Sequence, residues 1–192
     1  RLSLVGSEMC IRDRIEGTSV VDTSGNPLAV YHFTPNMEFE TFAKGDIGFH
    51  FGTSAQALQR GRDLGAAQGR VFRTYLNIQN PVHVHYDLLN WKPQQSALKL
   101  WSMGILTDAE LSEVQSLEGY DYNSPAAVML REILESKGFD GIVYPNGAEG
   151  DGFSYIAFRD DQIVQTDITA APAQRGEPSH TPVSYTHLTL PT

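Results

Sequence analysis

Hydrophobic and polar residues alternate along several short segments of this chain, and each of these segments predicts a β-strand. The alternation is clearest at 71–78, where Phe72 and Leu76 fall on one face and Arg73 and Tyr75 on the other. Further strands, rich in β-branched and aromatic residues, are predicted at 19–22, 28–34, 47–51, 141–144, 153–158 and 162–165.

Helical spacing dominates 86–138, in the middle of the chain, and a shorter helix is predicted at 54–67. Thr107 and Glu110 form a Thr-x-x-Glu capping box, and Ser124 before a proline marks another helix start. Because strands lie on both sides of this helical region, the sheet must gather segments from both ends of the chain. The predicted fold class is α+β, with helices packed on a mostly antiparallel sheet.

Composition is that of a globular protein with one domain. The chain has 192 residues, of which 41% are hydrophobic and 19% charged. Its net charge of −9 argues against non-specific nucleic-acid binding, which needs cations to replace the counterions of the phosphates. No apolar run approaches the ~20 residues that span a bilayer, so we expect no membrane partner. The one cysteine, Cys10, allows no internal disulfide, which weakly favours a reducing compartment.

The two ends of the chain differ from its middle. SLVGSEMCIRD near the start and VSYTHLTLPT at the end resemble translated sequencing-adapter peptides at the edges of environmental contigs. We interpret 1–14 as artefact or disordered, 15–169 as the folded domain, and 170–192 as a Pro/Ala/Gly-rich linker followed by artefact. The natural protein would then be longer on both sides, and Leu4 and Leu188 should lie outside the core.

Three features could carry chemistry, and each also has a structural interpretation. His32 lies on a predicted strand with its side chain opposite to those of Tyr31 and Phe33, either bonded within a sheet or facing a ligand. Segment 45–51 combines glycines with aromatic residues, which suits either a bend over core phenylalanines or the close approach of a flat ligand. Loop 146–152 is acidic and glycine-rich, and its carboxylates are either solvated or part of a site.

Several common motifs do not occur in the sequence. It has no G-x-S-x-G elbow, no phosphate-binding glycine loop and no H-E-x-x-H, so hydrolases and nucleoside triphosphatases lack their minimal parts. His83 and His85 alternate like a metal-binding pair, but no third ligand is near them in the sequence, and we expect no metal site.

The order and spacing of the motifs resemble ADP-ribosyltransferase-like domains, in the branch found in polyvalent proteins of phages and mobile elements. Segment 25–34 resembles their first strand, which carries a Tyr-His-Gly-Thr pattern. GFHFGTS at 48–54 resembles the second strand with the start of its helix, and YLNIQNP at 75–81 resembles the next strand. Segment 138–163 resembles the closing half, so the resemblance covers about 18–166.

This resemblance implies a split sheet whose cleft holds NAD in a bent conformation. It also implies an activity that breaks the bond between nicotinamide and ribose and transfers ADP-ribose to an acceptor. The implied catalytic residues are Glu149, as the carboxylate beside the oxocarbenium-like ribose, and His32, as a hydrogen-bond partner of the adenosine-side ribose. The implied NAD-binding residues are Tyr31, His32, Thr34, Gly48, Phe49, Phe51, Ser54, Ser154 and Tyr155, with Phe49 or Phe51 sandwiching the nicotinamide ring.

Two positions depart from the family's pattern. Phe33 stands where relatives usually carry glycine, so its ring either crowds the floor of the cleft or turns into the core. Ser154 stands where many relatives carry the catalytic glutamate, and a hydroxyl cannot supply charge. We therefore assign the acid to Glu149 rather than to Asp151, which is shorter and is flanked by glycines.

Three functions stay open at this point. The first is an enzyme that uses NAD as substrate and modifies an unknown acceptor, such as a host protein. The second is a catalytically silent module that binds NAD or another ligand, and the third is a structural phage-associated domain. Glu149 in the cleft favours the enzyme, Glu149 in solvent the silent module, and a large apolar patch elsewhere the structural domain. The resemblance implies action in the cytoplasm of a host cell and leaves delivery with a phage particle open.

Overall fold

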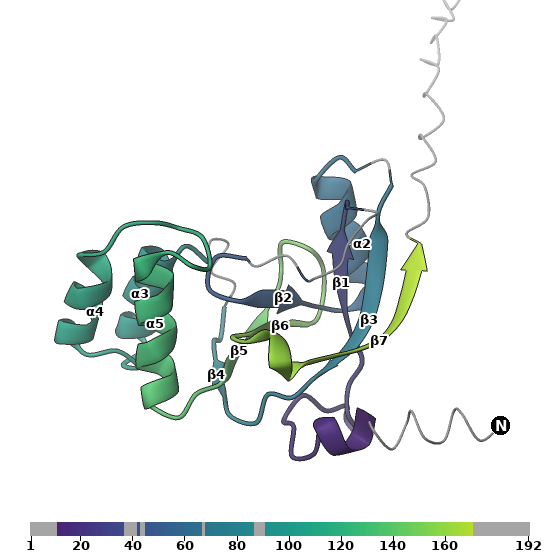
Figure 1. The fold of residues 1–192 in the computed structure, drawn as a ribbon, viewed down its shortest axis with the longest axis horizontal. Coiled ribbons are helices and arrows are strands. Elements are labelled where there is room, and N and C mark those ends of the chain that lie inside the picture. Colours follow the sequence, from purple (N-terminus) through teal and green to yellow (C-terminus); the bar gives the residue numbers. More distant parts are fainter. Residues whose placement is uncertain (1–10, 37–41, 43–44, 67, 87–90, 171–192) are drawn as a thin grey trace, which may run out of the picture.

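The computed structural model describes residues 11–36, 42, 45–66, 68–86 and 91–170, with the backbone alone for 165–170. Its strands form two sheets (Figure 1). The first sheet contains β1 (Val30–Thr34), β3 (Arg70–Leu76) and β7 (Ile163–Ala170), in the order β1-β3-β7. The second contains β2 (Phe49–Phe51), β4 (Pro81–His83), β5 (Gly141–Pro145) and β6 (Phe153–Ala157), in the order β2-β6-β5-β4.

Each sheet is mostly antiparallel. In the first, β3 pairs with both β1 and β7, which sets His32 opposite Phe72. In the second, β6 pairs with both β2 and β5, which sets Tyr144 opposite Ser154. Among the described strand pairs, β4 and β5 alone run parallel. The predicted fold class, α+β with a split, mostly antiparallel sheet, is confirmed.

A backbone bridge joins the two sheets where β1 passes the end of β2. The Tyr31 N–H donates to the Gly52 carbonyl at 2.8 Å, and the Gly52 N–H donates to the Tyr31 carbonyl at 2.9 Å. An apolar core fills the space between the sheets, formed by Val20, Val30, Phe49, Phe51, Leu76, Ile78, Ala157 and Ile163. Both features fix β1 and β2, which carry the histidines of the site described below.

Three helices cover the second sheet at one end of the molecule (Figure 1). They are α3 (Pro93–Ser102), α4 (Asp108–Gln115) and α5 (Pro125–Ser136). Thr107 and Ser124 cap α4 and α5, as their positions before Glu110 and a proline predict. Leu100, Leu130 and other apolar residues of these helices pack against the sheet residues Ile142 and Ile156 to form the largest core cluster.

Helix α2 (Ser54–Asp63) packs on β1 of the first sheet. The Phe33 ring lies between them, which shows where the ring at this departure from the family's pattern is accommodated. The Phe33 side chain is 8% exposed and clusters with Ala57 and Val71. A Cβ atom added to Gly61 or Gly69 would come within 2.8 Å or 2.4 Å of the Phe33 ring. Most of the ring has therefore turned into the core, in space that two glycines leave for it, while Phe33 also borders the pocket described below.

Element boundaries differ from the sequence-based ones at several places. The strand predicted at 19–22 is not formed, because the chain turns at 23–26 and Val21 makes only an isolated bridge with Pro27. The helix predicted at 54–67 ends at Asp63, just before Gly65, whose φ of 62° is left-handed. The strand predicted at 71–78 is observed at 70–76. β4 was not predicted, because Pro81 reads as a strand breaker; as its first residue, Pro81 is tolerated. β7 continues to Ala170, because it pairs with the whole length of β3.

The proposed boundaries at the ends are only partly covered by the structure. Ile15, the first residue of the predicted domain, is buried, and the Arg14 guanidinium donates to the Ile163 carbonyl at 3.5 Å. Leu4, Cys10 and Leu188 lie outside the described residues.

Candidate active site

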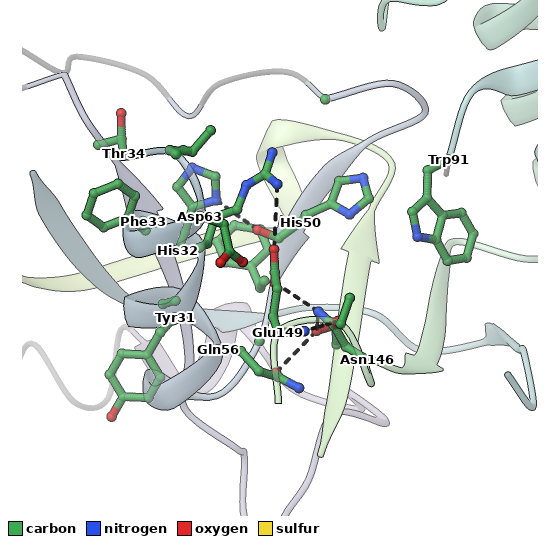
Figure 2. A pocket seen from close by; sticks show the side chains of 18 of the residues that line it. Tyr31, His32, Phe33, Thr34, His50, Gln56, Asp63, Trp91, Asn146 and Glu149 are labelled. Carbon is green, nitrogen blue, oxygen red and sulfur yellow. Dashed lines mark hydrogen bonds and ion pairs between the residues drawn. The ribbon is translucent and has the colours of Figure 1, made fainter. Parts of the chain in front are cut away.

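A pocket of about 620 Å³ lies where the two sheets and α2 meet. Its wall includes residues of β1, β2, α2 and the loop 146–152, together with Trp91 before α3 (Figure 2). This volume is within the range of small-molecule and cofactor sites. The pocket brings His32 of β1 and Glu149 of the acidic loop into one cavity.

His32 stands in the wall between the sheets. Its Nδ1 lies 2.8 Å from the His50 carbonyl oxygen, and its ring contacts Phe42 and Phe51 with centroids 5.6 Å away in each case. The buried Nε2 has no hydrogen-bond partner among the described residues. Burial lowers the pKa of His32, although the bond to His50 opposes the shift. A neutral imidazole with Nδ1–H donated to the carbonyl leaves Nε2 as an acceptor for a ligand hydroxyl.

His50, Trp91 and Tyr144 form an aromatic corner of the pocket. The rings of Trp91 and Tyr144 lie 4.6 Å apart, and the His50 ring lies 6.1 Å from that of Trp91. His50 Nδ1 is 3.4 Å from the Tyr144 hydroxyl. Burial lowers the pKa of His50 to about 4, and the neighbouring His32 and Arg60 act in the same direction. The corner is therefore uncharged at neutral pH and suits a flat ring.

Glu149 lies in the pocket wall beside Asn146 (Figure 2) and forms an ion pair with Arg60 of α2. The Asn146 side-chain amide donates to Glu149 Oε2 at 2.9 Å, and the Glu149 N–H donates to Asn146 Oδ1 at 3.1 Å. An Arg60 nitrogen lies 3.8 Å from Glu149 Oε1. The Glu149 side chain is 24% exposed, so it is neither buried in the core nor projecting into solvent.

Charged groups of both signs line the mouth of the pocket. Arg60 and Lys92 are cationic, and Asp46 and Asp63 are acidic. Burial raises the pKa of Asp46, an effect that the charges of Lys92 and Arg60 oppose. A ligand with both ring systems and anionic groups finds complementary chemistry here.

Six of the residues assigned from sequence line this pocket. They are Tyr31, His32, Thr34, Phe51, Glu149 and Ser154. Ser154 is 2% exposed, and its hydroxyl is hydrogen-bonded to Gln56 and Asn146. Tyr31 packs toward the cluster under α2, on the side of β1 opposite to His32.

The other four assigned residues lie outside the pocket wall, each for a packing reason. Phe49 is buried between the sheets with its ring 5.4 Å from that of Tyr122, and Tyr155 packs against the same core. A Cβ atom on Gly48 would lie 2.4 Å from the Ala157 carbonyl oxygen, so this glycine admits a neighbouring strand rather than a ligand. Ser54 is the exposed first residue of α2.

Sequence reasoning missed several residues of the pocket, above all Arg60, Trp91 and Gln56. The signal for Gln56 was present, because Thr53 and Gln56 form a Thr-x-x-Gln capping box that turns the glutamine side chain back toward β2. No comparable signal marks Arg60 or Trp91, which reach the pocket only through tertiary packing.

Comparison with known proteins decides the family. The sequence model described as "ADP-Ribosyltransferase in polyvalent proteins" matches residues 22–169. The chain belongs to this family. Within this ADP-ribosyltransferase-like domain the match begins at the turn before β1 and ends within β7, so it includes every described residue of the pocket.

The other comparisons add little to this assignment. No curated protein matches the chain. A solved structure titled "Crystal structure of an anti-CRISPR protein" aligns with 9% sequence identity and a TM-score of 0.26, over 72% of this chain and 95% of that one.

Among the residues that the structure describes, no three His, Cys, Asp or Glu side chains gather closely enough to hold a metal ion. Within the same part of the chain, no helix is long and apolar enough to cross a membrane.

Proposed function

We propose that this domain is an NAD-dependent ADP-ribosyltransferase. In the proposed reaction the bond between the nicotinamide nitrogen and ribose C1′ breaks, and its electron pair passes to the nicotinamide ring, which becomes neutral. The acceptor's nucleophilic atom forms the new bond to C1′ and loses its proton to solvent. Membership of the ADP-ribosyltransferase family supports this reaction class.

The observation that carries the proposal is the position of Glu149. Its carboxylate lies in the wall of the main pocket and is held by Asn146 at 2.9 Å. Positive charge grows on the ribose as nicotinamide leaves, and a fixed carboxylate stabilises that charge more in the transition state than in the ground state. Asp151, the other acid of the loop, is exposed and does not line the pocket.

Other residues of the wall are our proposed partners for a ribose and the diphosphate of NAD. To His32 Nε2, which has no partner among the described residues, we assign a hydrogen bond from a ribose hydroxyl. Arg60 and Lys92 supply positive charge for the diphosphate. An ion pair as exposed as that between Arg60 and Glu149 contributes at most about 1 kcal/mol, so the diphosphate can draw Arg60 away at little cost.

The aromatic corner is our proposed site for a ring of NAD. Phe49 packs against Tyr122 and does not line the pocket, whereas Phe51 lies beside His32 and does. Trp91 and Tyr144 also line the pocket, and their rings lie 4.6 Å apart. We therefore assign ring stacking to Trp91 and Tyr144, keep Phe51 as a further contact, and exclude Phe49.

We further propose that the domain acts in the cytoplasm of a host cell, as part of a larger polyvalent protein. The family description supports the polyvalent context.

The test is release of nicotinamide from labelled NAD, with host-cell lysate as the source of acceptors. Glu149→Gln should lower kcat by roughly 10²–10³ with little change in NAD affinity, because the lost charge acts mainly in the transition state. Asp151→Asn, the matched loss of charge on the same loop, should retain activity. If the unmodified protein binds NAD but releases no nicotinamide, the silent binding module replaces this proposal.

A further inference from the structure

A chain of buried side-chain hydrogen bonds runs from α2 to Glu149 (Figure 2). It consists of Gln56, Ser154 and Asn146, which we call the amide relay. These side chains are 1%, 2% and 5% exposed, respectively. Ser154 Oγ lies 3.2 Å from Gln56 Oε1, and Asn146 Nδ2 lies 2.9 Å from Ser154 Oγ. Asn146 Nδ2 also reaches Glu149 Oε2 at 2.9 Å.

At the α2 end of the amide relay, the neighbouring groups fix which atoms donate and which accept hydrogen bonds. The Thr53 N–H, which can only donate, lies 2.8 Å from Gln56 Oε1. The Gly150 carbonyl, which can only accept, lies 3.2 Å from Gln56 Nε2. Gln56 therefore presents an acceptor to Ser154, and the single hydroxyl proton of Ser154 must point to it.

The direction of donation is also fixed from Ser154 to the Glu149 carboxylate. Because the Ser154 hydroxyl proton is donated to Gln56, the Ser154 oxygen accepts a hydrogen bond from the Asn146 amide group. At the other end the Glu149 N–H donates to Asn146 Oδ1 at 3.1 Å, which fixes the same orientation of the amide independently. The second Asn146 N–H therefore points at Glu149 Oε2 and favours the ionised carboxylate.

Gly52 leaves the space that the amide relay needs. A Cβ atom at this position would lie 2.4 Å from Gln56 Oε1 and 3.0 Å from Ser154 Oγ. Gly52 also makes the backbone bridge to Tyr31 that joins the two sheets. The same residue therefore fixes the sheet junction and admits the polar contacts behind it.

We propose that Gln56, Ser154 and Asn146 are positioning residues that hold the Glu149 carboxylate in one place and in its ionised form. Ser154 does not contact the reacting atoms; it orients Asn146. The inference rests on the proposed function only for the catalytic role of Glu149. Hydrogen bonds among buried side chains lower the reorganisation that the carboxylate needs during the reaction.

The test compares Asn146→Ala and Ser154→Ala with Ser96→Ala. Ser96 is a matched control because it is fully buried, lies on α3, and its hydroxyl has no partner among the described residues. We expect kcat to fall about tenfold or more for Asn146→Ala and about three- to tenfold for Ser154→Ala, with KM for NAD little changed. The acidic limb of the pH–rate profile should move to higher pH in both, and Ser96→Ala should behave like the unmodified protein.

A second readout does not depend on catalysis. The side-chain carboxyl carbon of Glu149, labelled with ¹³C and assigned through Glu149→Gln, reports its protonation by NMR. Its titration midpoint should move upward by about one pH unit in Asn146→Ala and by less in Ser154→Ala. If Ser154→Ala does not fold, Ser154→Cys, a weaker donor and acceptor, should give a smaller shift in the same direction.

The outcomes separate this inference from the proposed function. A Glu149 midpoint in Ser154→Ala equal to that in Ser96→Ala would overturn the amide relay, whatever the activity. Shifted midpoints in a protein that releases no nicotinamide would support the relay and reject the transferase.

Discussion

The low pKa of His50, in the aromatic corner of the pocket, predicts how the stability of the protein falls in acid. Burial lowers the pKa of His50 from 6.5 to about 4. Above pH 6.5 both the folded and the unfolded chain carry this histidine uncharged, so its contribution to stability is fully present. As the pH falls toward 4, the unfolded chain binds a proton that the folded protein does not, and stability is lost.

The size of the effect follows from the two pKa values of His50. Integrating proton binding between them gives a loss of about 2 kcal/mol between pH 7 and pH 5, and about 3 kcal/mol when the titration is complete. His50→Phe removes the titrating group and keeps a ring beside Trp91 and Tyr144. The variant should therefore lose less stability than the unmodified protein over this pH range.

The assay is urea unfolding at pH 7, 6 and 5 for both proteins. Groups remote from the site titrate alike in both proteins, so the difference between their pH dependences isolates His50 together with the coupled His32. We expect that difference to reach about 2 kcal/mol at pH 5 relative to pH 7. Equal pH dependences in the two proteins would refute the idea that His50 stays uncharged in the pocket wall.

Three further predictions concern packing and binding. Gly61→Ala should destabilise the protein by about 1–2 kcal/mol in thermal or urea unfolding, because its Cβ would lie 2.8 Å from the Phe33 ring. In a Phe33→Leu background the same change should stabilise the protein, since alanine is the better helix former, and destabilisation there as well would contradict the packing. His32→Ala should weaken NAD binding by about 1 kcal/mol or more in titration calorimetry through the lost hydrogen bond to a ribose, so equal affinities would sink the assignment. Phe49→Leu should lower the free energy of unfolding by about 1 kcal/mol and leave NAD affinity unchanged, because the Phe49 ring packs on Tyr122 in the core. A matching loss of NAD affinity would show that Phe49 belongs to the binding site.

Local sequence patterns predicted much of the fold. The alternation around Phe72 predicted β3, and the caps at Thr107 and Ser124 predicted the starts of α4 and α5. These signals are local, because each depends on residues within one turn or one strand. β4 was missed although Val82 and Val84 alternate with His83 and His85, because Pro81 was interpreted as the end of the preceding strand. Its pairing with β5 depends on residues far away in the sequence.

The site was harder to predict than the fold, for a physical reason. Alternation places Phe49 and Phe51 on the same face of β2 but does not say what covers that face. Tyr122 covers Phe49, whereas Phe51 lies beside His32. Arg60 and Trp91 reach the pocket from α2 and from the chain before α3, and only the packing of both around the sheet junction brings them together.

The family resemblance placed Glu149 in the site, and the loop geometry gives that expectation a physical basis. The usual position of the acid holds Ser154, which the fold uses to orient Asn146. Asn146 in turn binds the Glu149 carboxylate. A carboxylate moved from the strand to the loop needs such support, because a glycine-rich loop does not fix a side chain by itself.

A crystal structure of Glu149→Gln with intact NAD would test the central claim most directly, because the slow variant should retain its substrate. The account predicts the nicotinamide ribose beside residue 149, with a ribose hydroxyl within hydrogen-bond distance, about 2.6–3.2 Å, of its side chain. It also predicts the diphosphate near Arg60 and a second ribose hydroxyl on His32 Nε2. NAD bound with its nicotinamide ribose remote from residue 149, or beside Asp151, would contradict it.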